Sequence, residues 1–317
     1  MEGACPIFEE ESSQRRITDL LPELALRICG FLDVPDLVNV CESIPGWRWI
    51  LTTCPFPTLM CHHINQWTWL DKRLCQLMFP QPSPTSFQSA PEAIRYEKEQ
   101  RDSYECFMSR PARGKAPRTA HFSILPDHDV SAMSEEEFAL RMEASKIPLF
   151  GYISMIKCRS HTRIVGMHGC IYSGQSAERG RSVIVRKTRF VGEGGGHDCC
   201  DCIIYLADAS RFLRDDFAAV VESLAPHQTL AIAVIINGKR DESNEMDCLV
   251  RFIRRLGGFD GSVLAGVSAN WRLWCIKRHE GSFTNWSNLL EWGFYDVMRK
   301  RVESGQERDW TKNSKLK

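Results

Sequence analysis

Cysteine and histidine side chains gather in two places where they could hold a metal or attack a substrate. The first group follows the glycine-rich run 192–196 and consists of His197, Cys199, Cys200 and Cys202. A zinc site here would also need ligands from the segment 158–170 to lie close by. Cys202 is the first residue of a strand that we expect to be buried, which disfavours its use as a metal ligand. The second group is the run 61–63, Cys-His-His, whose neighbouring residues seldom face each other as a nucleophile and its base must. We therefore predict no metal site and no catalytic residue.

The side chains that would cradle a nucleotide phosphate are missing where the chain would need them. A triphosphate is held by backbone amides and a lysine, which the pattern GxxxxGK followed by Ser or Thr supplies. Between a predicted strand and a predicted helix, the segment 126–133 reads Pro-Asp-His-Asp-Val-Ser-Ala-Met instead. Asp127 and Asp129 would repel a triphosphate, and no Lys-Ser or Lys-Thr pair follows the glycine run. We predict that the chain binds no cofactor.

The elements that position these residues alternate between strand and helix from His121 onward. Apolar runs indicate buried strands at 202–207, 230–236 and 262–267, and helices at 246–256 and 286–302. Further strands are expected at 121–125, 148–156 and 183–190, and a further helix from Glu135. Strands that are apolar on both faces and separated by helices are typical of parallel sheets. The sequence thus predicts a doubly wound α/β domain.

The segment 17–51 predicts a small helical hairpin that precedes this domain. Leu24, Ile28 and Phe31 recur at three- and four-residue steps, the stripe of a helix that buries one face. Pro22 fits the first turn, and Asp36 is expected to cap a second helix that ends before Pro45-Gly46. A hairpin of about thirty residues buries too little surface to be stable alone. We therefore expect it to pack against a partner.

Composition excludes several classes of function. Residue counts of 40 basic and 40 acidic side chains give zero net charge, which favours neither nucleic acid nor an anionic membrane. The 14 cysteines are expected to be reduced, because the first sixteen residues carry no apolar core of a signal peptide. The longest aliphatic run, 230–236, is about a third of the length of a membrane-spanning helix. We expect a soluble protein in the cytoplasm, with the nucleus as a further location.

The hairpin resembles an F-box, the module that docks on the adaptor Skp1. The resemblance rests on the order Leu-Pro-Glu-Leu at 21–24 and on the spacing of the apolar residues after it. It implies that Skp1 contacts six residues: Leu21, Pro22, Ile28, Leu32, Leu37 and Trp47. The alternative is an ordinary helical hairpin inside a larger core.

The order of strands and helices in the second half resembles a small GTPase. The segment 237–241, Asn-Gly-Lys-Arg-Asp, stands where that family has Asn-Lys-x-Asp, and 268–270, Ser-Ala-Asn, stands where it has Ser-Ala-Lys. Both depart from the family pattern, so the resemblance implies remnants of the fold and no working guanine site.

Together, an F-box and a degenerate GTPase-like domain resemble the family of F-box only protein four. The resemblance implies five parts: a disordered N-terminus at 1–14, the F-box at 15–65, a helical linker and basic connector at 66–118, an atypical GTPase-like substrate-binding domain at 119–305 and a tail at 306–317. It also implies a non-catalytic substrate receptor of a Skp1-cullin-F-box ubiquitin ligase, with cullin-1 and a RING protein as further partners. The substrate would be held by the helix 246–256 through Cys248, Arg251, Phe252 and Arg255. The alternative is an ordinary amphipathic helix with Leu249, Phe252 and Ile253 in the core and its arginines in solvent.

Two other functions stay open from the sequence: a divergent nucleotide-binding GTPase with a helical extension, and an F-box protein that works outside any ligase. By resemblance, a telomere-repeat binding factor and a D-type cyclin are the first candidate substrates, but no residue establishes either. The oligomeric state is also open, with a homodimer among the options.

Overall fold

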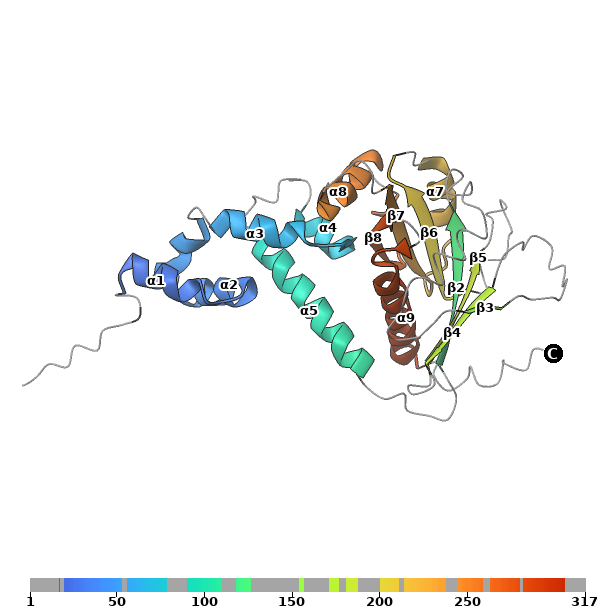
Figure 1. Ribbon diagram of the computed structural model, residues 1–317, viewed down its shortest axis with the longest axis horizontal. Helices are drawn as coiled ribbons and strands as arrows, with labels where there is room; N and C mark the ends of the chain where they lie inside the picture. The colour runs from blue at the N-terminus through green and yellow to red at the C-terminus, as the bar shows by residue number, and fades with distance from the viewer. Residues whose placement is uncertain are drawn as a thin grey trace, which may run out of the picture. The chain divides into compact units, whose positions relative to one another are not determined.

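A computed structural model describes residues 17, 20–52, 56–78, 90–109, 118–126, 154–156, 171–176, 181–187, 200–210, 214–237, 244–258, 263–279 and 282–305. The chain divides into two compact units, Met1–Met60 and Cys61–Lys317. Figure 1 shows the helices of the first unit and the sheet with its helices in the second. In the described segments, no helix combines the length and hydropathy that crossing a bilayer requires.

The first unit is built from short helices. They are α1 Pro22–Cys29, α2 Val34–Ser43, the 3-10 helix η2 Pro45–Thr52 and the beginning of α3 Phe56–Asn65, which crosses the division between the units. Pro22 lies in the first turn of α1, as predicted. The predicted cap of α2 is wrong, because Oδ1 of Asp33 accepts the hydrogen bond from the backbone N–H of Asp36 at 2.9 Å. Asp36 lies inside the first turn, where an acidic side chain is favoured by the helix dipole.

In the described segments, the second unit contains a mixed sheet of nine strands. Its strands are β1 Trp69–Asp71, β2 Arg118–Pro126, β3 Ser154–Ile156, β4 Ile171–Ser176, β5 Arg181–Lys187, β6 Cys202–Asp208, β7 Thr229–Asn237, β8 Asn270–His279 and β9 Ser282–Phe283. The order is β1-β8-β7-β6-β2-β5-β4-β3, with β9 paired to β8. The central strands from β8 to β5 are parallel, whereas β1, β3, β4 and β9 pair antiparallel. The predicted parallel sheet is therefore the centre of a larger mixed sheet.

Helices cover both faces of this sheet. They are α4 Lys72–Met78, α5 Ala90–Ser109, α7 Arg214–Glu222, α8 Glu245–Arg255 and α9 Trp286–Glu303. On β6, the Tyr205 ring packs on Phe217 of α7, whereas Cys202, an odd number of residues away, lies beside Gly293 of α9. Because side chains alternate along a strand, α7 and α9 lie on opposite faces. The doubly wound arrangement follows from these contacts.

Helix α9 approaches the sheet closely at Gly293. A Cβ atom at this position would lie 3.2 Å from the Phe122 ring and 3.3 Å from Sγ of Cys202. The glycine lets the helix backbone rest directly on β2 and β6.

The residues 66–109, predicted as part of a linker, pack into the second unit. Trp69–Asp71 forms the edge strand β1 on β8, and α5 contacts α9. The Tyr104 hydroxyl of α5 donates to Oε2 of Glu291 at 2.6 Å, and Ser103 Oγ lies 3.1 Å from the Tyr295 hydroxyl. Helix α5, expected as part of a linker, is thus fixed to α9 of the second unit.

The prediction of a strand at 262–267 is wrong. Residues 263–266 form a turn, and the strand is Asn270–His279, which the sequence analysis missed. Arg272, the third residue of this strand, gives the segment a polar character, but its side chain is buried. Other predicted features lie outside the described residues: the loop 127–133, the helix from Glu135, the connector 110–117, the segment 238–243, the glycine run, and His197 with Cys199.

Candidate functional site

Helix α1 exposes its large apolar side chains and buries its small ones. Leu21 and Phe31 are 64% and 86% exposed, and Leu24 and Ile28 between them are also exposed. Leu21 directly precedes α1, and Phe31 lies in the turn that follows it, where its N–H donates to the carbonyl oxygen of Ile28 at 3.1 Å. Their three- and four-residue spacing from Leu24 and Ile28 continues one side of the helix, and we call these four residues the apolar face of α1. Ala25 and Cys29, on the neighbouring stripe of the helix, are buried. Leu26, on the side away from the apolar face, is 38% exposed. The sequence analysis expected this stripe to bury one face; in the chain alone the stripe faces outward.

Helix α1 is held to α2 through its small residues. The thiols of Cys29 and Cys41 are buried and hydrogen-bonded to one another, and burial raises the pKa of the Cys41 thiol to about 11. Both thiols stay protonated at neutral pH and pack as small apolar groups. The contact leaves the large side chains of α1 free to meet another protein, which is the usual meaning of a contiguous exposed apolar patch.

The structure divides the predicted Skp1-binding residues into two groups. Leu21, Pro22 and Ile28 are exposed, and Leu32 is half-buried. Leu37 and Trp47 are only 3% and 2% exposed, and their elements α2 and η2 pack against one another. These two residues serve the internal packing of the unit.

Two further residues of the apolar face were missing from the predicted interface. Leu24 and Phe31 share the spacing of Leu21 and Ile28 and are as exposed. The signal that could have found them is the three- and four-residue spacing itself, because every member of one stripe lies on one face.

The predicted substrate-binding residues on α8 are also divided. Cys248 and Phe252 are buried, and the Cys248 thiol is hydrogen-bonded to Cys275 of β8, which raises the pKa of the Cys275 thiol. The prediction that these two residues contact a substrate is wrong, because they lie on the buried side of the helix. Arg251 and Arg255 are exposed. Only the arginines can meet a partner.

The two remnants of a guanine site lie at opposite ends of the sheet. Asn270 pairs with Thr229 at the start of β7, whereas Asn237 at the end of β7 pairs with Arg278. At about 3.3 Å per residue, the nine-residue strand separates them by roughly 26 Å. The segment 268–270 leads into β8, whose first residue is Asn270, and follows a turn instead of the predicted strand. Asn237 and Asn270 cannot contact the same base.

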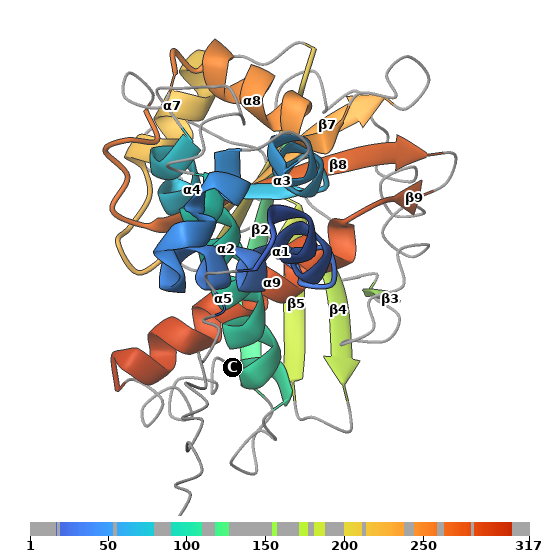
Figure 2. The ribbon, with the colours of Figure 1, turned by 90° about the vertical axis from the view of Figure 1, so that its left-hand side faces the viewer.

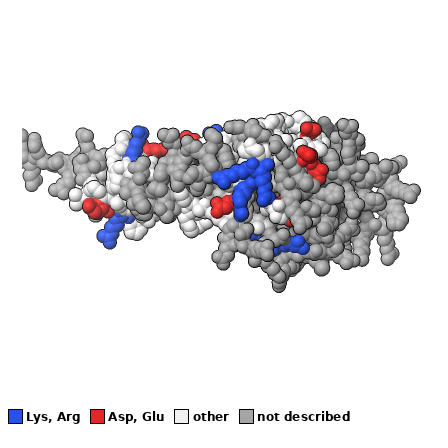
Figure 3. Space-filling model, turned by 90° about the horizontal axis from the view of Figure 1, so that it is seen from above, with Lys and Arg blue, Asp and Glu red and all other residues white. Residues whose placement is uncertain are grey.

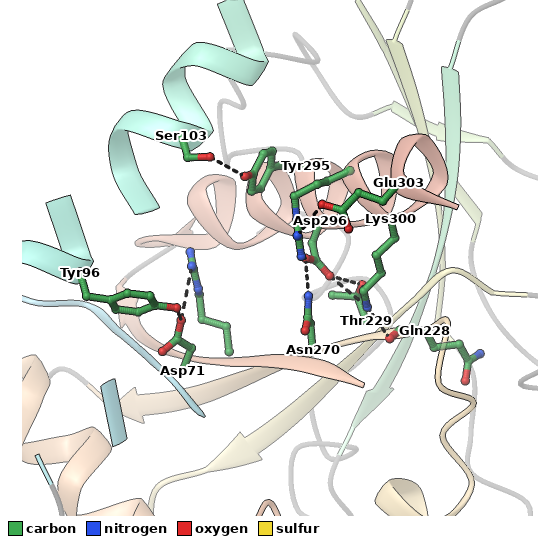
Figure 4. Close-up of polar contacts among 12 residues, drawn as sticks. Asp71, Tyr96, Ser103, Gln228, Thr229, Asn270, Tyr295, Asp296, Lys300 and Glu303 are labelled. Atoms are coloured by element: carbon green, nitrogen blue, oxygen red, sulfur yellow. Dashed lines mark hydrogen bonds and ion pairs between the residues drawn. The ribbon is translucent and has the colours of Figure 1, made fainter. Parts of the chain in front are cut away.

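Asn270 instead belongs to a polar cluster around Asp296, a buried residue of α9 (Figure 4). The Asp296 carboxylate accepts hydrogen bonds from Oγ1 of Thr229 at 2.6 Å and Nδ2 of Asn270 at 2.9 Å. Arg299 and Lys300 form ion pairs with it at 3.0 and 3.1 Å. Burial alone would raise the pKa of this carboxyl group, but the Lys300 charge and the hydrogen bonds outweigh it and lower the pKa. The cluster ties α9 to the first residues of β7 and β8.

A second buried group surrounds Arg272 on β8. Its guanidinium carbon lies 3.6 Å from the Trp69 ring and 4.7 Å from the Trp292 ring, and the Asp71 carboxylate is 3.9 Å away. Burial lowers the pKa of Arg272 to about 10, so the side chain stays charged at neutral pH. Asp71 also accepts the Tyr96 hydroxyl at 2.7 Å. This group joins β1 and α5 to β8 and α9.

The two polar groups differ in how fully their donors and acceptors are paired. In the Asp296 cluster, donors and cations surround the carboxylate, whereas Nε of the buried Arg272 has no hydrogen-bond partner among the described residues. A groove of about 310 Å³ between α7 and the segment 263–269 is lined by small and apolar residues with one carboxylate, Glu222. Within the described segments, no three His, Cys, Asp or Glu side chains are placed to hold a metal ion.

Comparisons with known proteins find similarity to solved structures alone. No protein-family model and no curated protein matches the sequence. One similar structure is Era of Aquifex aeolicus bound to GDP and aluminium fluoride, with 11% identity, a TM-score of 0.34 and 56% of each chain covered. Another is the elongation factor SelB of Methanococcus maripaludis with a GTP analogue, with 9% identity, a TM-score of 0.29, and 61% of this chain and 34% of that one covered.

A third is SsGBP in complex with GDP, with 10% identity, a TM-score of 0.28, and 90% of this chain and 86% of that one covered. This chain thus spans about half of the Era structure and about a third of SelB. TM-scores this low do not support an argument about function. The structure itself establishes a small all-α unit and a mixed α/β sheet with helices on both faces.

Proposed function

We propose that this chain is a non-catalytic substrate receptor of a Skp1-cullin-F-box ubiquitin ligase. The observation that carries the proposal is the exposed apolar face of α1, formed by Leu21, Leu24, Ile28 and Phe31. It lies in the segment whose sequence resembles an F-box. Exposure of large apolar side chains to water is unfavourable in free energy, and binding in the groove of a partner removes this exposure.

The expected association is a helix in a groove. Full burial of a leucine, isoleucine or phenylalanine side chain contributes roughly 1.5 to 3 kcal/mol, so four such residues supply the free energy of a stable complex. Leu37 and Trp47 act indirectly in this account. Their burial keeps α2 and η2 packed against one another, and α1 contacts α2 through Cys29 and Cys41.

The second unit would hold the substrate. Its sheet is tied to α9 by the Asp296 cluster and to β1 and α5 by Arg272. A rigid unit of this kind can present a bound protein to the ubiquitin-conjugating enzyme that cullin-1 and its RING partner carry. The chain accelerates ubiquitin transfer by holding the two reactants near one another, with no reacting group of its own.

The test is capture of purified Skp1 and cullin-1 by the full chain and two variants. The double variant Ile28→Ala and Phe31→Ala removes exposed side chains, so it is expected to fold normally and to lose Skp1. Val302→Ala is the matched control, because Val302 is an exposed apolar residue on α9 of the other unit. Capture by the wild type and the control but not by the double variant supports the proposal. Equal capture by all three, or capture by none, contradicts it.

A further inference from the structure

The outer side of α8 carries three arginines. Arg251, Arg254 and Arg255 are exposed, on the side opposite the buried residues Met246, Leu249 and Ile253. Figure 3 shows Lys and Arg side chains gathered in one group on this face of the molecule.

Helix α4 adds to this positive charge. It begins with Lys72 and Arg73, both exposed. Helices α4 and α8 both contact β1 and β8, and they lie beside one another in Figures 1 and 2. We call Lys72, Arg73, Arg251, Arg254 and Arg255 the basic surface.

The arginines of α8 are not neutralised within the described part of the chain. The hydrogen bonds of Arg251 go to the carbonyl oxygen of Asp247 at 3.3 Å and to Sγ of Cys248 at 3.4 Å. Nη1 of Arg255 donates to the carbonyl oxygen of Ala209. These acceptors are uncharged, so they orient the guanidinium groups and leave their charge available.

The stability of the two helices accounts for only part of the basic surface. Arg254 and Arg255 lie in the last turn of α8, where the helix dipole favours them. Lys72 and Arg73 lie in the first turn of α4, where the dipole opposes positive charge. Arg251 repels Arg254 and Arg255, because residues three and four apart on a helix are neighbours. The surface therefore costs stability, which a negatively charged partner would recover.

We propose that the basic surface binds an acidic segment of the substrate protein, a deepening that rests on the function proposed above. Guanidinium groups bind carboxylates through paired hydrogen bonds, and oppositely charged surfaces raise both the rate and the specificity of association. Arg251 and Arg255 are already oriented by their own hydrogen bonds, so less side-chain entropy is lost on binding.

An acidic protein segment fits this surface better than a nucleic acid does. Proteins that bind single-stranded nucleic acid place aromatic rings among the basic residues, where the bases stack. Helix α4 has no aromatic residue, and Phe252, the aromatic residue of α8, is buried. The chain as a whole carries no net positive charge to attract a phosphate backbone.

The experiment measures binding of a fluorescein-labelled hexaglutamate peptide to the full chain at low salt by fluorescence anisotropy. The variant Arg251→Glu with Arg254→Glu reverses two charges of the surface and spares Arg255, which anchors α8 to Ala209. Its matched control, Arg27→Glu with Arg48→Glu, reverses two exposed charges on the first unit. We expect about a tenfold loss of affinity in the α8 variant, little change in the control, and binding of a hexalysine peptide by the α8 variant alone.

Unchanged peptide affinity in the α8 variant, or no binding by the wild type, overturns the proposal. So does tighter binding of a labelled single-stranded RNA than of the peptide by the wild type. If the glutamate variant unfolds, Arg251→Gln with Arg254→Gln removes the charges without reversing them and is expected to lose a smaller factor. Skp1 capture by the same preparations separates the two proposals, because a failure of peptide binding with Skp1 capture intact overturns the acidic partner alone.

Discussion

The guanidinium group of Arg272 lies 3.6 Å from the ring of Trp69, so a residue of the central part of the sheet is held against its edge strand. The Asp71 carboxylate, two residues after Trp69, completes this contact at 3.9 Å. Through it, the segment before α5 becomes part of the second unit.

Removing the carboxylate of this pair should leave a buried charge without its partner. We predict that Asp71→Ala lowers the free energy of unfolding of the second unit by about 3 to 5 kcal/mol. Asp102→Ala is the matched control, because Asp102 is exposed on α5, and a change within about 0.5 kcal/mol is expected there. Denaturant unfolding monitored by tryptophan fluorescence measures both. Equal stabilities of the two variants would mean that the Arg272 contact is not what anchors β1.

The Asp296 cluster should make stability depend on acid. The folded state lowers the pKa of this carboxyl group below its ordinary value of 3.8, so the unfolded chain takes up a proton first as the pH falls. The stabilisation is therefore complete above about pH 5 and is lost as the pH falls through the folded pKa. Unfolding free energies of the wild type and Asp296→Asn should differ by a constant amount above pH 5 and converge in stronger acid. A difference that stays constant down to the lowest pH at which both fold would contradict this account.

The close approach of α9 to the sheet should make Gly293 intolerant of a branched side chain. Gly293→Val places methyl groups against the Phe122 ring and Cys202, and overpacking of this kind costs about 1 to 3 kcal/mol. Thermal unfolding measures the effect, with Gly266→Val as a control because a Cβ atom there meets nothing within 4 Å. A Gly293 variant as stable as the wild type would show that α9 can move away from β2 and β6 at little cost.

The cap of α2 differs between the structure, where it is Asp33, and the sequence-based prediction, where it is Asp36. Asp33→Ala removes the acceptor for the Asp36 N–H and should lower the stability of the first unit by about 1 kcal/mol. Asp36→Ala leaves that hydrogen bond intact and should cost a few tenths of a kcal/mol. Circular dichroism of the two variants in denaturant compares them. The reverse order of stability would restore Asp36 as the cap.

The sequence predicts the parts of the fold that depend on local patterns. Strands β6 and β7 are apolar on both faces, and α5, α8 and α9 have helical periodicity, so their positions were predictable. Strands β1 and β8 were missed because Arg272 becomes compatible with a buried strand only after Trp69, Asp71 and Trp292 surround it. That arrangement joins residues far apart in the chain, and no local pattern reports it.

The candidate site was predictable to a similar extent. The spacing of Leu21 and Ile28 predicts one face of a helix, but spacing alone does not say whether the face turns inward or outward. Leu37 and Trp47 read as interface residues and are buried, because α2 and η2 need them for their own packing. On α8, the amphipathic pattern offered Phe252 in the core with its arginines in solvent as the alternative, and the burial of Phe252 and exposure of Arg251 confirm that alternative.

The most direct test of the account is the heat of binding of Skp1 to the full chain, measured by titration calorimetry at several temperatures. Burial of the apolar face predicts a negative change in heat capacity on binding. For Ile28→Ala with Phe31→Ala it predicts a loss of several kcal/mol of binding free energy. A loss of about 2.7 kcal/mol already corresponds to a hundredfold weaker affinity. The Val302→Ala control should bind like the wild type. Binding that is equally tight in the double variant, or no heat of binding in the wild type, would contradict the claim that the apolar face of α1 docks the chain on Skp1.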